Sequence, residues 1–182
     1  MIKRVTRIIV ALLIVLSLSA ASAFAAAEAA SVKTVPGTGV EADSRVVDAF
    51  VDLGFTVKYD KNHNYAGTFS VAKHAIIMRT DNKMNFLHEM GHFVSEINNA
   101  AGTSKEFTSI YKSEKKKYRG SMKTYITRTS EEYFAQSFAE YTISPSALKK
   151  SRPKTYKYIK ASVEAIDQKA IDDMYAAYSW AW

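Results

Sequence analysis

The sequence contains no cysteine among its 182 residues. Disulfide bonds, thiolate ligands for zinc and a cysteine nucleophile are therefore excluded. Histidine and carboxylate side chains remain as the candidate metal ligands. The fold must be stabilised by packing, together with any metal ion that it binds.

Long apolar runs and internal repeats are missing as well. After residue 27 no stretch is apolar enough to cross a bilayer. We therefore expect no membrane association once the first segment is removed. We also expect a monomer without a nucleic-acid partner. The remaining length is enough for one domain with a real core.

The first 27 residues have the three parts of a secretory signal peptide. A basic start precedes an apolar core at residues 8–18 and a small-residue stretch at residues 20–27. We expect cleavage after Ala23, Ala25 or Ala27, and a secreted or cell-surface protein; an uncleaved signal anchor is the alternative. Removing the segment takes away three positive charges, so the formal net charge of +7 becomes 7 − 3 = +4.

Residues 28–43 are predicted to be a flexible lead-in. They are rich in Ala, Ser, Thr, Gly and Pro, and the Pro-Gly-Thr-Gly run at residues 36–39 cannot belong to a regular element. This places the folded domain at residues 44–182.

Within this domain, short extended segments come first and helices follow. A helix is expected at residues 44–53, with Gly54 as its end signal. Strands are expected at residues 55–59, 67–71 and 75–78, and helices around residue 88 and at residues 104–119, 130–143 and 154–177. A small sheet followed by helices indicates an α+β fold that is mostly α.

The most informative motif is the run His88-Glu89-Met90-Gly91-His92, which reads H-E-x-x-H. In a helix, residues i and i+4 share a face, so His88 and His92 can present two imidazoles to one metal ion while Glu89 activates water. Thr80 or Asp81 is the expected helix cap. The alternative is a chance pair of histidines on an ordinary amphipathic helix.

A catalytic zinc site needs a third protein ligand. His63 and His74 lack metal-ligand spacing, and no histidine follows His92, so a carboxylate is indicated. The expected helix at residues 130–143 carries Glu132, Gln136 and Glu140 at i, i+4 and i+8 on one face. Alternatively, Glu131 and Glu132 only stabilise the N-terminus of this helix.

The stretch from Tyr125 to Phe138 reads Y-I-T-R-T-S-E-E-Y-F-A-Q-S-F and follows the H-E-x-x-H motif, a combination that is more specific than either motif alone. It resembles the catalytic domain of anthrax toxin lethal factor and its relatives, the secreted Pro-Pro endopeptidases. In that family a Tyr lies seven residues before a zinc-binding Glu, as Tyr125 precedes Glu132. A Pro-Lys-Thr-aromatic string at residues 153–156 also recurs there.

The resemblance implies a zincin-like single domain with a small mixed sheet, an active helix and a helical C-terminal half. It implies one zinc ion held by His88, His92 and Glu132, with Glu89 as general base and Tyr125 as the donor that stabilises the oxyanion. Simple core packing is the alternative for Tyr125. Where the family commonly has a second Glu, this chain has Gln136.

These features predict a secreted zinc endopeptidase that acts on extracellular or surface proteins, with Pro-rich segments as the cleavage sites that the resemblance suggests. The alternatives are a non-catalytic surface or adhesion protein and a toxin-type protease. We expect residues 76–79 to form the strand edge that pairs with substrate, with Lys73, His74 and Arg79 near the cleft. A solvated edge strand protected by charge is the alternative. The run Lys115–Lys117 is interpreted as a solvated face, with acidic-polymer binding as the alternative.

Overall fold

The computed structural model describes residues 31–181. The predicted signal peptide at residues 1–27 lies outside this range. Among the described residues, none of the helices combines the length and the apolar character that a membrane span requires.

A β-hairpin forms the start of the described domain. Strand β1 (Val32–Thr34) pairs antiparallel with β2 (Glu41–Asp43). Val35 and Val40 at the base of the loop are buried, and the Val35 amide donates to the Val40 carbonyl at 2.9 Å. The prediction of a flexible lead-in is therefore wrong for residues 32–43, because apolar side chains hold this segment against the core. The Pro-Gly-Thr-Gly run forms the turn.

Three further strands form a small mixed sheet. Its order is β3 (Thr56–Tyr59), β5 (Ala75–Met78), β4 (Gly67–Ser70). Strands β3 and β5 are parallel, and β4 is antiparallel to β5. The prediction that residues 76–79 form an edge is wrong, because β5 is the central strand and has a neighbour on each side. The edge beside the H-E-x-x-H helix is β4.

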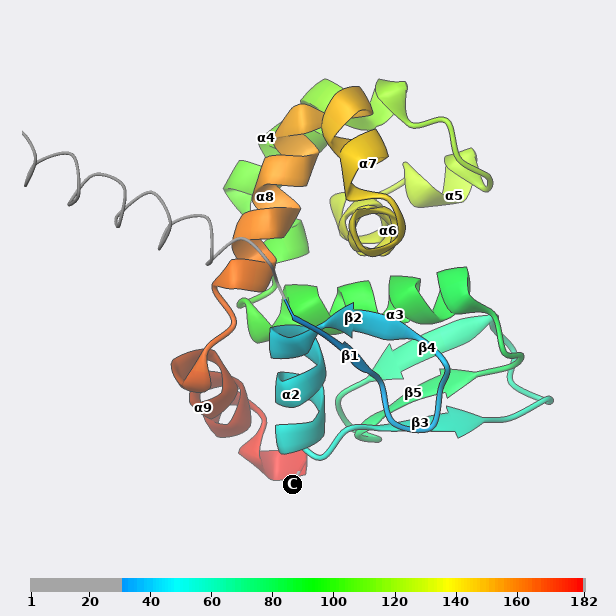
Figure 1. Cartoon of the computed structure of the whole chain (residues 1–182), viewed down its shortest axis with the longest axis vertical. Helices are drawn as coiled ribbons and strands as arrows, with labels where there is room; N and C mark the ends of the chain where they lie inside the picture. The colour runs from blue at the N-terminus through cyan, green and yellow to red at the C-terminus, as the bar shows by residue number, and fades with distance from the viewer. Residues whose placement is uncertain (1–30, 182) are drawn as a thin grey trace, which may run out of the picture. The chain divides into compact units, whose positions relative to one another are not determined.

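Helix α3 (Lys83–Ile97) carries the H-E-x-x-H motif and lies between the sheet and α6 (Ser130–Ile143), as Figure 1 shows. Its cap is Asn82, whose side chain accepts from the Asn85 amide at 2.9 Å, and not the expected Thr80 or Asp81. Gly91 permits close contact between the two helices, since a Cβ there would lie 2.5 Å from the Ala135 carbonyl oxygen.

The helices expected at residues 44–53, 104–119 and 154–177 are present, the last two with a break, and two short helices at residues 123–126 and 145–151 were not expected. The helix expected at residues 104–119 ends at Glu114 and continues as a 3-10 turn, and the one expected at residues 154–177 breaks near Ile166. The bounds are α2 (Ser44–Asp52), α4 (Lys105–Glu114), α5 (Lys123–Ile126), α7 (Pro145–Ser151), α8 (Pro153–Glu164) and α9 (Gln168–Ala177).

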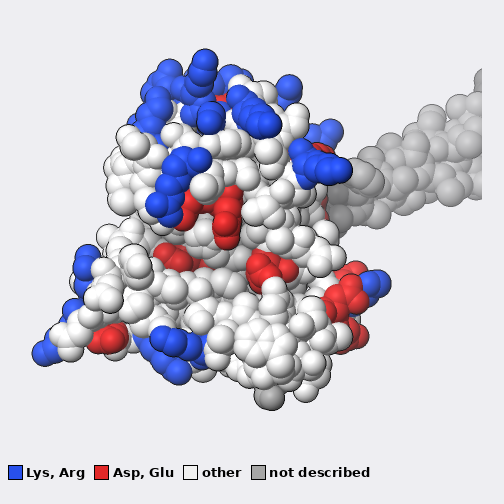
Figure 2. Space-filling view, turned by 180° about the vertical axis from the view of Figure 1, so that it is seen from behind, with Lys and Arg blue, Asp and Glu red and all other residues white. Residues whose placement is uncertain are grey.

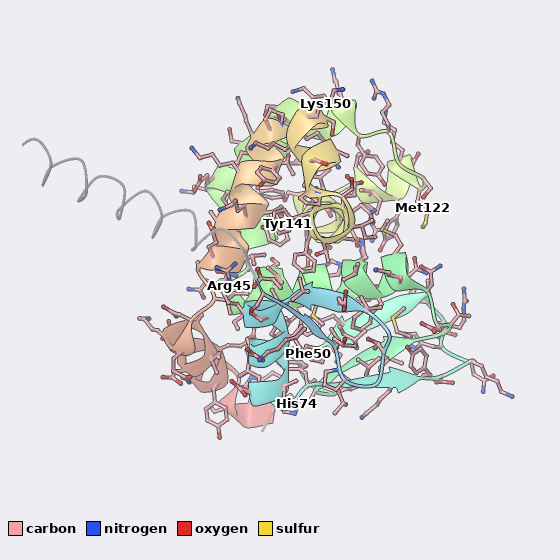
Figure 3. All side chains as sticks on the ribbon, in the orientation of Figure 1. Arg45, Phe50, His74, Met122, Tyr141 and Lys150 are labelled. Atoms are coloured by element: carbon pink, nitrogen blue, oxygen red, sulfur yellow. The ribbon has the colours of Figure 1, made fainter. Side chains whose placement is uncertain are left out.

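Aromatic side chains fill the core on both sides of α3. Phe50 of α2 contacts Phe93 of α3 edge to face, with ring centroids 5.3 Å apart, and Phe107 packs similarly on Phe134 of α6. Figure 3 shows Phe50 pointing inward from α2. The predicted class, α+β and mostly α, is confirmed. Because α3 is packed on both faces, its two histidines are held in fixed positions.

Candidate metal centre

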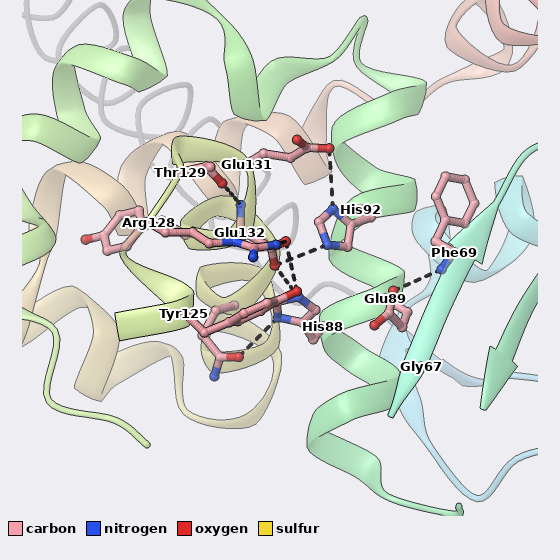
Figure 4. A network of polar contacts seen from close by, with 12 residues as sticks. Gly67, Phe69, His88, Glu89, His92, Tyr125, Arg128, Thr129, Glu131 and Glu132 are labelled. Atoms are coloured by element: carbon pink, nitrogen blue, oxygen red, sulfur yellow. Dashed lines mark hydrogen bonds and ion pairs between the residues drawn. The ribbon is translucent and has the colours of Figure 1, made fainter. Parts of the chain in front are cut away.

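His88, His92 and Glu132 come together between α3 and α6, although Glu132 lies 40 residues after His92 in the sequence (Figure 4). One candidate ligand atom from each residue lies within 4.8 Å of the other two. Glu132 Oε2 is 3.1 Å from His88 Nε2 and 3.8 Å from His92 Nε2. The three residues predicted as metal ligands thus face one point.

The surroundings of His88 fit a metal ion. Its Nδ1 lies 3.2 Å from Gln136 Oε1, and the Gln136 amide nitrogen donates to the sulfur of Met84 at 3.4 Å, which directs the amide oxygen toward the ring. His88 Nδ1 is therefore the donor. Its Nε2 then faces a carboxylate oxygen, a contact that requires a proton or a metal ion between them. Two imidazoles and a carboxylate are a donor set that suits zinc.

His92 has different surroundings. Its Nδ1 lies 3.9 Å from Glu131 Oε1, a carboxylate on the exposed side of α6. Burial lowers the pKa of His92, but the hydrogen bond to Glu132 and the negative charges of Glu89 and Glu131 outweigh burial and raise it. The Nδ1 atom of His92 thus faces the charged carboxylate of Glu131, whereas the Nδ1 atom of His88 faces the neutral amide of Gln136.

Glu132 is held by side chains on its second oxygen. Oε1 accepts from the Tyr125 hydroxyl at 2.9 Å and from Arg128 Nη2 at 3.0 Å, and Thr129 Oγ1 caps the Glu132 amide at 3.2 Å. Burial alone would raise the pKa of Glu132, but hydrogen bonds from His88, His92 and Tyr125 hold that pKa well below its usual range. The carboxylate is charged and oriented.

Tyr125 stands at the open side of the centre. Its side chain is exposed to 37%, and the Arg128 guanidinium lies 4.2 Å from the centroid of its ring. Burial and the hydrogen bond to Glu132 raise the pKa of Tyr125 to about 12. The hydroxyl therefore stays protonated at neutral pH and can act as a hydrogen-bond donor.

Glu89 points away from Glu132, toward the edge strand β4. Its Oε2 accepts from the main-chain amide of Phe69 at 2.9 Å (Figure 4). The absence of a side chain at Gly67 is needed here, because a Cβ would lie 2.8 Å from Glu89 Cγ. The carboxylate predicted as general base is thus fixed beside the centre by main chain.

A cavity of about 460 Å³ opens over these residues. Figure 2 shows it as a hollow with acidic side chains inside. Its lining includes the carboxylates Glu89, Glu96 and Glu131, with Tyr65 and Phe69 on the strand side. The expectation that Lys73, His74 and Arg79 lie near the cleft is wrong, since none of them lines the cavity.

The other two histidines lie outside the centre. His63 Nε2 is 2.8 Å from Thr68 Oγ1, and the ring of His74 packs edge to face on Phe55 at 5.4 Å. Neither belongs to the group of candidate metal ligands, in agreement with their lack of metal-ligand spacing.

The sequence did not predict the roles of three residues beside the centre: Arg128, Gly67 and Phe69. Arg128 precedes Glu132 by four residues, the spacing of a helical ion pair, and this signal could have identified it. The Phe69 contact is made by a main-chain amide, for which the sequence carries no signal.

Two histidines from one helix, a carboxylate from a second helix and an adjacent edge strand form the arrangement of candidate ligands that is typical of proteins with a zinc-peptidase site. The sequence model of the family described as anthrax toxin lethal factor, N- and C-terminal domain, matches residues 56–162, more than half of the chain. The chain belongs to this zinc-dependent family. A search of the curated proteins found no match.

Proposed function

We propose that this protein is a zinc-dependent endopeptidase that hydrolyses peptide bonds in extracellular or surface proteins. The observation that carries the proposal is the convergence of His88, His92 and Glu132 at an open cavity that also contains Glu89 and Tyr125. A non-catalytic binding protein would need neither of the last two residues in the cavity. Family membership supports protein substrates.

His88, His92 and Glu132 would hold the zinc ion. When bound, zinc supplies Lewis acidity, which makes water a better nucleophile at neutral pH. The outer partners Gln136 and Glu131 orient the two imidazoles so that their Nε2 atoms face inward. Tyr125 and Arg128 hold the carboxylate of Glu132 from the opposite side.

Glu89 is the proton acceptor in this proposal. Its carboxylate lines the cavity one residue after His88, and its Oε2 is fixed by the Phe69 amide. Oε1 takes no part in that contact and can accept a proton from attacking water. The same oxygen can then return the proton to the leaving amine.

Tyr125 supplies a neutral donor. Its hydroxyl can move from Glu132 to the oxygen of a scissile carbonyl as negative charge develops there. The raised pKa of Tyr125 keeps the proton in place throughout the neutral range.

Strand β4 replaces the expected substrate edge. It has β5 on one side and the cavity on the other, so an extended peptide could pair along it. The Phe69 amide already donates to Glu89, which leaves main-chain acceptors as the outward groups at this position. The family resemblance suggests a Pro-rich segment as substrate, and Tyr65 and Phe69 offer aromatic surfaces for proline rings.

Zinc content together with a digest of a proline-rich peptide library tests the proposal. We expect one zinc ion per chain and cleavage by the natural sequence, and no cleavage by a Glu89→Gln variant that still holds zinc. A matched library with alanine in place of proline tests the sequence preference. Stoichiometric zinc without cleavage of any peptide would contradict the enzymatic proposal and favour a binding protein.

A further inference from the structure

A strongly basic face lies at the end of the domain formed by α4, α7 and α8. Figure 2 shows Lys and Arg side chains gathered there, above the acidic hollow, and Figure 3 places Lys150 at this end. The basic face consists of Lys116, Lys117, Arg119, Lys149, Lys150, Lys154 and Lys157, all of them exposed.

Two buried contacts join the separate segments that carry these cations. Glu114 Oε2 accepts from both the amide and the hydroxyl of Thr155 at 2.9 Å, which joins the end of α4 to the start of α8. The buried guanidinium of Arg152 lies 5.3 Å from the centroid of the Tyr118 ring. Every cation of the basic face lies within three residues of one of these four residues, so the core fixes the cluster.

Acidic residues are absent from the segments that build the face. Residues 115–130 and 141–163 contain no Asp or Glu. Glu114 is 1% exposed and pairs with Lys117 at 3.1 Å. In the described part of the chain, none of the ion pairs involves Lys116, Lys150, Lys154 or Lys157. A solvated surface usually mixes both signs of charge, and this one does not.

The chemistry of the face indicates one kind of partner. Lysine predominates over arginine on this face. Lysine attracts a partner as a point charge, whereas the arginine guanidinium recognises a single carboxylate or phosphate group through two parallel hydrogen bonds. Among the described residues, no exposed large apolar side chain lies between the cations of the face, and the nearest in sequence are Met122 and Ile143, outside the runs that carry the cations. Insertion into a lipid surface and stacking on bases both need such side chains. Between the cations themselves, charge must therefore supply the attraction.

We propose that the basic face binds a linear phosphate-bearing polymer along its length. Binding releases counterions from the polymer and is therefore steeply salt-dependent. The carboxylates Glu89, Glu96 and Glu131 in the cavity repel the same polymer, so the cavity stays open to peptides while the domain is bound.

Binding of long-chain inorganic polyphosphate, measured by isothermal titration at several salt concentrations, tests this proposal. The test variant combines Lys116→Gln, Lys150→Gln, Lys154→Gln and Lys157→Gln. The matched control combines Lys58→Gln, Lys61→Gln, Lys73→Gln and Arg79→Gln, four exposed cations in the strand region. Both variants lose the same net charge, and none of these residues belongs to the metal centre. Melting temperature and zinc content verify the fold.

We expect the test variant to bind at least about 10²-fold more weakly at low salt, and its log K against log salt slope to become shallower by about 3. The control should lose less than about 3-fold, because surface charges beyond a Debye length are screened. Equal losses in both variants would assign the effect to net charge and overturn the proposal. Tighter binding to phosphatidylglycerol vesicles than to polyphosphate at equal phosphate concentration would overturn it in favour of a lipid surface.

Discussion

Glu89 and Glu132 lie on two sides of the candidate metal centre, and their carboxylates are held by different means. On the side of α3 and β4, Glu89 is fixed by a main-chain amide and by the missing side chain at Gly67. On the side of α5 and α6, Glu132 is fixed by the side chains of Tyr125 and Arg128. The position of Glu89 depends on the backbone of a strand, whereas the contacts that hold Glu132 can be removed individually by substituting one side chain at a time.

Removing a metal ligand should have the largest effect, and it involves both sides at once. His88→Ala, His92→Ala or Glu132→Ala should abolish zinc retention, because each removes one of three ligands. Metal analysis after dialysis measures this, with His63→Ala as a control outside the centre. Stoichiometric zinc in both histidine variants would refute the ligand assignment. In the natural sequence, affinity should weaken as pH falls, since the imidazoles must be neutral to bind, and the raised pKa of His92 makes this loss begin at a higher pH than for an ordinary histidine.

Glu89→Gln tests the strand side. The amide keeps the shape and can still accept from Phe69, but it cannot take a proton. We expect activity to fall by about 10²–10⁴-fold with zinc content and melting temperature unchanged. Near-normal turnover of a cleaved peptide with zinc bound would show that another residue activates water.

Tyr125→Phe tests the helical side. The change removes one hydroxyl and keeps the ring beneath Arg128. A donor to the developing oxyanion should lose about 10²–10³-fold in kcat with little change in KM, because the bond forms chiefly in the transition state. Steady-state kinetics on a zinc-replete variant measures the split. An unchanged kcat would leave Tyr125 with a packing role only.

Gln136→Ala should have the smallest of these effects and acts on the metal alone. Loss of the acceptor for His88 Nδ1 should weaken zinc affinity by about 10- to 100-fold. Competition with a chelator measures the affinity, and Gln136→Glu should restore it because a carboxylate can accept the same hydrogen bond. Unchanged affinity in Gln136→Ala would show that Gln136 does not orient His88.

The sequence predicted the elements of the site better than its surroundings. The bounds of β5 and α6 agree with prediction, since both depend on local periodicity and on signals such as the Thr129 cap. The break of the closing helix was missed although Asp167 caps α9, its side chain accepting from the Ala170 amide. The continuous apolar pattern concealed that break.

What the sequence determined by itself was chemistry at short range: two histidines one turn apart, a carboxylate on a later helix, and a tyrosine seven residues before it. Only the tertiary structure decided which strand forms the edge, that residues 32–43 belong to the domain, and that Glu89 is held by Phe69. These facts depend on strand order and main-chain hydrogen bonds. Every residue but proline carries the same main-chain donor, so no residue type marks in advance which strands will pair.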